Sequence, residues 1–266
     1  MINQLLGRKR KRVTIDKLLV DGQTLTNPTK IAQTMNDYFC NIAQELKANP
    51  NADPKLDPNK RCFTNITLTP TTAEEISLII RSFENKSTAD SSILAIKHVN
   101  SKIAKSLSEI INDSLDQGIF PDELKVAKVI PIHKSGSRSE RSNYRPISLL
   151  PTFSKIYERV MCSRLTMHFK QTDTLHNQQF GFRAGHSCEH TILTAQSNIL
   201  RALDRSQIAL LLLIDFSKAF DMVDHAALLK KLEHYGIRGS ALQWLRTYLD
   251  NRSQYVNLGM SKSAPG

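Results

Sequence analysis

The feature that most constrains the fold of this chain is an apolar run, Ile208–Ile214, that ends at a carboxylate, Asp215. Seven consecutive apolar residues between polar ones predict a fully buried central β-strand. A carboxylate at the end of such a strand destabilises the fold unless a partner compensates its charge. A divalent metal ion is one such partner; capping of a helix or an ion pair with a basic side chain explains Asp215 equally well.

The residues after Asp215 predict a turn followed by a helix. Phe216–Ala219 suit a turn whose backbone N–H groups face a phosphate. Asp221 and Asp224 stand where a helix over 225–234 is expected to begin, before Gly236 ends it. N-capping explains both aspartates without a catalytic role.

The charge balance predicts a polyanionic partner. The 266 residues include 36 Lys and Arg against 25 Asp and Glu, a net charge of +11 at pH 7. Such a balance favours nucleic acid or an anionic membrane surface. No apolar run is long enough for a membrane-spanning helix, and none follows the basic start as in a secretory signal. We therefore expect an intracellular protein without a membrane partner, in the nucleus or the cytoplasm.

Two basic segments are candidates for binding phosphates. The first, Arg8–Arg12, suits a nuclear import signal, a phosphate-binding arm or a solvated terminus. The second runs from Leu124 to Arg145: VIPIHK predicts a β-strand and SGSRSERSN a flexible turn. A flap that closes over phosphates and a solvated basic loop both fit this second tract. Its basic residues are Lys125, Lys128, Lys134, Arg138, Arg141 and Arg145.

Two shorter segments contain residue types that bind nucleic-acid bases or metal ions. Gln179–Arg183 (QFGFR) offers rings and a cation to a stacked base, or forms a buried turn. His186, Cys188 and His190 are metal-ligand types within five residues, but they stand where a helix is expected to begin, which favours capping over zinc. The four cysteines are scattered without a C-x-x-C pair, so a disulfide framework is not expected.

Hydrophobic periodicity and capping signals predict the remaining elements. Overlapping Thr-x-x-Glu boxes at Thr71 and Thr72 predict a helix start, and residues 47–62 have the composition of a linker. The other expected elements are strands over 13–20 and 254–258 and helices over 29–46, 101–115, from Thr152 through Leu165, from Ser187 through Leu203, and after a Ser240 cap.

Four sequence blocks occur in order between Lys125 and Gly266: VIPIHKSGSRSERSNYRPISLL, QFGFRAGHS, LLLIDFSKAFDMVDH and YLDNRSQYVNLGMSKSAPG. In these blocks the chain resembles the reverse transcriptases of non-LTR retrotransposons, of the jockey and LINE type. The upstream segment IDKLLVDGQTLTNPTKIAQTMNDYFCNIAQEL resembles the connector between endonuclease and polymerase in these proteins.

The resemblance implies an α+β fold. We expect the fingers and a partial palm of a polymerase right hand, with an incomplete antiparallel sheet, after a mainly helical N-terminal region. The expected divisions are a connector over 1–62, a helical region over 63–124 and a reverse transcriptase domain over 125–266.

The resemblance also implies a metal site. Asp215 matches the family's first catalytic aspartate, which binds two Mg²⁺ ions that activate the primer hydroxyl and stabilise the leaving pyrophosphate. Phe216 matches the residue that lends a backbone carbonyl to one ion. The implied substrates are a dNTP, an RNA template and a DNA primer.

Further residues match the family's nucleotide-binding positions. Lys134 and Arg145 match residues of the fingers that hold the incoming triphosphate. Lys218 and Ala219 match positions whose backbone N–H groups meet the triphosphate, and Phe220 matches an aromatic ring that leaves no room for a 2′-hydroxyl. Gln179, Gly181 and Arg183 fall in the block that contacts the template.

One departure from the family pattern stands out. The family continues into a Pro-Gln-Gly block and a hairpin with an aromatic-x-Asp-Asp motif, and neither occurs in this sequence. Because one carboxylate cannot hold two metal ions, we expect a truncated reverse transcriptase that is inactive alone. Two alternatives stay open: a non-catalytic, basic nucleic-acid-binding remnant of a decayed element, and a decayed element or incomplete gene model without any function.

Overall fold

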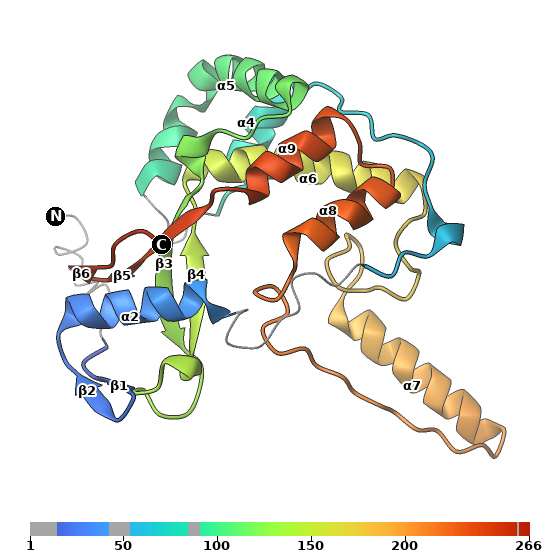
Figure 1. Cartoon of the computed structure of the whole chain (residues 1–266). Helices are drawn as coiled ribbons and strands as arrows, with labels where there is room; N and C mark the ends of the chain where they lie inside the picture. Colours follow the sequence, from blue (N-terminus) through green and yellow to red (C-terminus); the bar gives the residue numbers. More distant parts are fainter. Residues whose placement is uncertain (1–14, 43–53, 85–90, 260) are drawn as a thin grey trace.

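The computed structural model describes residues 15–42, 54–84, 91–259 and 261–266, which form helices and short strands (Figure 1). The predicted mixture of helix and strand is confirmed. In chain order the helices and strands are β1 (Leu18–Val20), β2 (Gln23–Leu25), α2 (Pro28–Cys40), α4 (Ala73–Ser82), α5 (Ser91–Gln117), β3 (Val126–His133), β4 (Tyr144–Leu149), α6 (Thr152–Gln171), α7 (Cys188–Asp204), α8 (His225–His234), α9 (Ser240–Leu249), β5 (Ser253–Leu258) and β6 (Ser261–Lys262).

Helices α4, α5, α6, α8 and α9 share one hydrophobic core. Its most prominent feature is an aromatic cluster around Phe120, whose ring meets those of Tyr157, Trp244 and Tyr248 edge-on at centroid distances of 5.8, 5.2 and 5.0 Å. The buried indole N–H of Trp244 donates to Ser114 Oγ at 3.0 Å, so the polar group of the cluster is satisfied. This core buries an apolar face of each of these five helices.

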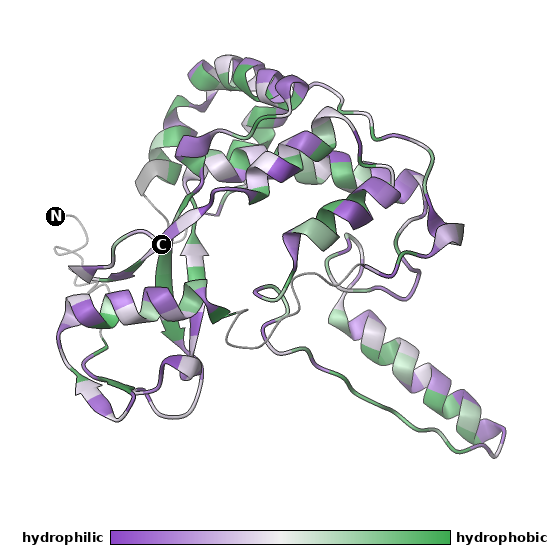
Figure 2. Cartoon of the chain, in the orientation of Figure 1, coloured by the Kyte–Doolittle hydropathy of each residue, from purple (hydrophilic) through white to green (hydrophobic). Residues whose placement is uncertain are grey.

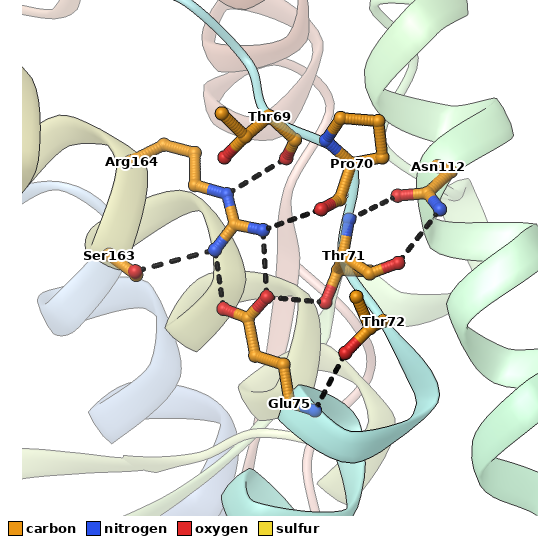
Figure 3. Close-up of polar contacts among 8 residues, drawn as sticks. All are labelled: Thr69, Pro70, Thr71, Thr72, Glu75, Asn112, Ser163 and Arg164. Carbon is orange, nitrogen blue, oxygen red and sulfur yellow. Dashed lines mark hydrogen bonds and ion pairs between the residues drawn. The ribbon is translucent and has the colours of Figure 1, made fainter.

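A buried arginine joins the helical core to the chain segment that precedes α4 (Figure 3). Arg164 on α6 forms a bidentate ion pair with Glu75 on α4 and also donates to the carbonyl oxygens of Thr69 and Pro70. Thr72 caps α4, as predicted, by accepting the Glu75 N–H at 3.2 Å. The Glu75 carboxylate does not complete a capping box, because it faces Arg164 instead.

The second core lies between helix α2 and a four-stranded sheet of order β4-β3-β5-β6. The apolar residues whose spacing predicts the helix over 29–46 are buried in this core: Ile31, Met35 and Phe39 on α2, and Ile42 just after it. The β1–β2 hairpin precedes α2 and turns at Asp21-Gly22, where φ is 49° and 78°, the left-handed pair that a tight hairpin requires.

The expectation of a purely antiparallel sheet is wrong. β3 pairs with β4 antiparallel but with β5 parallel, Val129 lying opposite Val256. A parallel pair requires a crossover that returns the chain to the same end of the sheet. Helices α6 to α9 lie in sequence between these two strands and form that crossover.

The expectation that Ile208–Ile214 forms a buried central strand is also wrong. These residues form no regular element, and Ile208, Leu210 and Leu213 are 98%, 95% and 82% exposed. A strand needs hydrogen-bonding neighbours, and in the described part of the chain no strand pairs with this run. Figure 2 shows a hydrophobic, extended segment after α7, a helix that itself has no buried residue.

Several element boundaries differ from the predicted ones. Helix α5 begins at Ser91, ten residues before the expected start at Ser101. The N-cap of α9 is Gly239, with φ 62°, and Ser240 is the first helical residue and makes no capping bond. Helix α2 spans Pro28–Cys40, and the remainder of the expected helix falls partly among residues 43–53, outside the described residues, as do Val13 and Thr14 of the first expected strand.

No helix among the described residues has the length and apolar character needed to cross a membrane. The division of the chain at residues 62 and 124 stays a prediction. The core around α2 spans both positions, because β1 and α2 pack with β3 and β5, and the helical core spans position 124, because α4 and α5 pack with α6 and α9.

Candidate functional site

The predicted basic strand and turn form the β3–β4 hairpin, whose loop we define as residues 134–143. The backbone N–H of Lys134 donates to the carbonyl of Asn143 at 2.8 Å and closes the loop. Asn143 Nδ2 donates to Ser137 O at 3.0 Å and to Glu140 Oε2 at 3.1 Å. Gly136 has φ 77°, and a Cβ there would lie 2.6 Å from Asn143 Nδ2, so this turn requires glycine. These contacts give the loop a defined conformation.

The six basic residues of the tract are not equivalent. Lys134, Arg138 and Arg145 are exposed. Lys125 is 4% exposed and pairs with Asp122 at 2.6 Å, so it is unavailable to a phosphate, and Lys128 is half-buried in β3. The structure thus leaves fewer cations for a polyanion than the sequence count of six indicates.

Arg145 lies on the face of the sheet that α2 does not cover. Its register partner on β3 is Ile132, and Ile147, two residues further along β4, points to the same face. Ile132 and Ile147 are 44% and 46% exposed, whereas Val129 on the opposite face is fully buried against α2. The hairpin therefore presents a charged and apolar surface on its open side.

Asp215 stands at the end of the apolar run and begins an exposed turn over residues 215–221. The side chains of Asp215 and Phe216 are exposed, Phe216 by 77%. Lys218 adopts a left-handed φ of 51°, and its carbonyl accepts the N–H groups of Asp221 and Met222 at 2.9 and 3.1 Å. Among the described residues, no hydrogen bond or ion pair joins Asp215 to Lys134 or Arg145.

Asp224 is the N-cap of α8, as expected, and accepts the Ala227 N–H at 2.6 Å. The expectation that Asp221 also caps this helix is wrong, because it lies three residues upstream in the turn. The helix ends before Gly236, as predicted; its φ is 91°, and a Cβ there would lie 2.3 Å from Thr64 O.

A tyrosine on α2 connects the turn to the hairpin loop. Tyr38 is 5% exposed, and its phenol oxygen accepts a hydrogen bond from Lys218 Nζ. Lys218 Nζ also lies 4.6 Å from the Tyr38 ring centroid, and the guanidinium of Arg141 lies 4.9 Å from the same centroid. One buried ring therefore contacts a cation from the hairpin loop and a cation from the 215–221 turn.

Phe220 and Phe182 connect the turn to the QFGFR segment. Their rings meet edge-on at 5.9 Å, and the two side chains are 78% and 94% exposed. Phe182 has a left-handed φ of 59°, a conformation that is costly for an aromatic residue. The alternative of a buried turn at Gln179–Arg183 is therefore wrong for Phe182, whose ring faces solvent.

The capping interpretation of the His186–His190 segment is confirmed. Ser187 accepts the His190 N–H, and His190 Nδ1 accepts the Ser187 N–H, which is a reciprocal capping box at the start of α7. Throughout the described ranges, no three His, Cys, Asp or Glu side chains gather closely enough to hold a metal ion.

Tyr38 is the functional candidate that the sequence alone did not reveal. It lies 103 residues before Arg141 and 180 before Lys218 in the chain, so no local pattern links them. Its place beside Phe39 on the buried side of α2 indicates only a core residue. A signal was present in the phenol hydroxyl itself, since tyrosines that are buried among apolar helix positions bring their hydroxyl to a partner.

Comparison with known proteins identifies the class. The family model described as "Reverse transcriptase (RNA-dependent DNA polymerase)" matches residues 132–264, half of the chain, and this range includes both the hairpin loop and the turn. The chain therefore belongs to the reverse transcriptase family.

Its relatives come from mobile elements, which confirms the resemblance to reverse transcriptases of non-LTR retrotransposons. "Probable RNA-directed DNA polymerase from transposon BS" of Drosophila melanogaster is 35% identical over 166 residues, 60% of this chain and 18% of that protein. "RNA-directed DNA polymerase from mobile element jockey" of the same species is 29% identical over 204 residues, 75% of this chain and 22% of that protein. A "Transposon TX1 uncharacterized 149 kDa protein" of Xenopus laevis is 23% identical over 264 residues, 96% of this chain and 20% of that protein. The chain thus spans about a fifth of the length of these relatives.

Proposed function

We propose that this chain is the nucleotide-binding part of an RNA-directed DNA polymerase, made of the fingers and the first part of a right-hand palm. Its macromolecular partners are an RNA template and a DNA primer. The observation that carries the proposal is the docking of the hairpin loop and the 215–221 turn on one ring, that of Tyr38, because it brings two segments of the family-matched region together.

In this proposal the triphosphate binds between the hairpin and the turn. Lys134 and Arg145 are exposed and supply a point charge and a planar fork, which both suit phosphate oxygens. The backbone N–H groups of Lys218 and Ala219 meet the triphosphate from the other side. Phe220 lies against the sugar and excludes a 2′-hydroxyl, and its contact with Phe182 limits how far its ring can turn away.

The donor chemistry at Asp215 fits Mg²⁺. The exposed carboxylate of Asp215 and the carbonyl of Phe216 are hard oxygen ligands, and Mg²⁺ sites commonly combine one or two carboxylates with substrate phosphates and water. When bound, the ion would supply activation of the primer hydroxyl and neutralisation of the leaving pyrophosphate. The chain's own part is to keep the Asp215 carboxylate exposed to solvent at the start of the turn that faces the triphosphate.

A two-ion site needs more carboxylates than Asp215 supplies. Since the described residues assemble no cluster of three ligand side chains, we propose that this chain does not polymerise by itself. The second candidate function is a basic nucleic-acid-binding module without catalysis, and the exposed cations Lys134, Arg138 and Arg145 support it.

The decisive experiment is primer extension on an RNA template by the complete reading frame that contains this sequence. We expect Mg²⁺-dependent DNA synthesis, and we expect Asp215→Ala to abolish it. Asp204→Ala, an exposed aspartate at the end of α7, is the matched control. Extension retained by Asp215→Ala would reject the assigned role of Asp215. Synthesis by the 266-residue chain alone would show that the proposed inactivity is wrong.

A further inference from the structure

Helix α2 lies upstream of the family-matched residues 132–264, yet it contacts several parts of that region. Besides the contacts of Tyr38, Gln33 Oε1 accepts the Ala264 N–H at 2.9 Å and Asn36 Nδ2 donates to Ala264 O at 3.2 Å. Asn36 is fully buried. Helix α2 is therefore built into the same core as the hairpin and the last sequence block.

The contacts of Tyr38 differ from ordinary packing because they gather like charges. Lys218 and Arg141 both lie within 5 Å of one ring centroid, so their charges are at most about 10 Å apart, roughly one Debye length at 0.1 M salt. Such cations repel each other, and the negative face of the ring and the phenol oxygen offset the repulsion. No carboxylate lies within ion-pair distance of Lys218 in the described part of the chain.

We propose that Tyr38 is a positioning residue that fixes the hairpin loop 134–143 and the turn 215–221 relative to each other. That the two segments bind a triphosphate rests on the proposed function, whereas their positioning by Tyr38 does not. The phenol oxygen holds the turn through Lys218, and the ring holds the loop through Arg141. Because Lys134 and the N–H groups of the turn belong to these segments, Tyr38 sets the width of the triphosphate site.

The test is hydrogen exchange of the 266-residue chain, measured by mass spectrometry on peptides that cover 134–143 and 215–222. Hydrogen-bonded amides report on each segment: those of Lys134 and Asn143 in the loop, and those of Asp221 and the adjacent Met222, which both donate to Lys218, for the turn. Tyr38→Phe keeps the ring and loses the oxygen, so we expect faster exchange in the turn alone. Tyr38→Leu removes both contacts, so we expect exchange about 2- to 30-fold faster in both segments.

Phe39→Leu is the matched control. It loosens the packing of the same helix, since Phe39 is 8% exposed, but leaves Tyr38 in place. A packing role alone would make Tyr38→Leu and Phe39→Leu alike, with faster exchange spread over α2 and β5, and that result would overturn the proposal.

A polymerase assay separates this inference from the proposed function. If the complete reading frame is active, Tyr38→Leu is expected to raise KM for the dNTP more than it lowers kcat. If the reading frame shows no polymerase activity, the proposed function fails while the exchange result still decides the role of Tyr38. If the exchange pattern of Tyr38→Leu matches that of Phe39→Leu, the positioning role fails while the polymerase assignment stands.

Discussion

Arg164 on α6 and Glu75 on α4 form a bidentate ion pair in which the Arg164 side chain is 5% exposed and the Glu75 side chain 29%. The remaining N–H groups of Arg164 meet the carbonyls of Thr69 and Pro70, and Thr71 Oγ1 donates to Glu75 at 2.8 Å (Figure 3). This pair joins two helices of the larger core to the segment before α4. It links elements that are distant in the sequence, so it matters more for stability than the pair between Lys125 and Asp122, which are three residues apart.

Removing either partner of this pair is expected to destabilise the chain, and the two removals are not equal. Glu75→Ala leaves a buried guanidinium without its counter-charge and is expected to cost about 3 kcal/mol or more. Arg164→Met leaves a carboxylate that water and Thr71 still reach, so we expect a smaller loss. Chemical denaturation checks both values, and Arg159→Ala, an exposed arginine on the same helix, should change the free energy of unfolding by less than about 0.5 kcal/mol. Equal effects at Arg159 and Arg164 would contradict this account.

The same pair predicts a loss of stability in acid. The hydrogen bond from Arg164 is the main cause that lowers the pKa of Glu75, and burial opposes it. The folded chain therefore keeps this carboxylate ionised at a pH where the unfolded chain is already protonated. The stabilisation of the fold by the ionised Glu75 is complete above the pKa of this carboxyl group in the unfolded chain, about 4.3. It is lost as the pH falls through the lower pKa that Glu75 has in the folded chain.

Thermal unfolding between about pH 6 and pH 3 measures this effect. We expect the difference in Tm between the wild type and Glu75→Gln to shrink toward the acid end of this range. Glu109→Gln, which changes an exposed carboxylate on α5, is the control. A difference that stays constant with pH would show that Glu75 does not titrate as proposed.

The salt dependence of nucleic-acid binding is expected to reflect three exposed cations of the hairpin tract. Each phosphate contact lowers log K by about 0.9 per unit of log salt for duplex DNA. If Lys134, Arg138 and Arg145 make these contacts, the hairpin contributes a slope of about −2.7, about half of what six contacts would give.

Binding titrations with a short duplex at several salt concentrations test this number. Replacing the three residues with glutamine should remove about 2.7 from the slope, whereas Lys102→Gln on the exposed face of α5 should not change it. An unchanged slope in the triple variant would remove the hairpin from the nucleic-acid interface.

Local signals predicted much of this structure. The strand character of VIPIHK, the Thr72 cap, the Asp224 cap and the stripe of α2 each depend on residues within one turn or strand of each other. Such signals act through backbone geometry and periodicity, so they can be recognised without the rest of the fold.

Signals that depend on a distant partner failed or were missed. The residues of the apolar run before Asp215 are of types that favour burial. A buried strand also requires neighbouring strands, and the described residues provide none for this run. The parallel pairing of β3 with β5 and the contacts of Tyr38 depend on residues more than 100 positions apart, and no local pattern encodes them.

Phe220 provides the most specific prediction about substrate choice. In the proposed site its ring lies against the sugar of the incoming nucleotide, so Phe220→Ala should open space for a 2′-hydroxyl. We expect the complete reading frame with Phe220→Ala to incorporate ribonucleotides at least about tenfold more readily relative to deoxynucleotides, which corresponds to 1.4 kcal/mol of lost discrimination. Because Phe182 contacts the edge of this ring, Phe182→Ala should relax the same discrimination more weakly.

Competition between dNTP and rNTP in primer extension measures both effects as ratios of kcat/KM. Phe63→Ala is the control, since Phe63 is an equally exposed ring, 80% exposed, on the segment before α4. The steric role predicts a graded order in which Phe220→Ala relaxes selection most, Phe182→Ala less, and Phe63→Ala not at all. Unchanged discrimination in Phe220→Ala would mean that the ring does not meet the sugar, and equal effects of Phe182→Ala and Phe63→Ala would mean that the edge contact does not hold it in place.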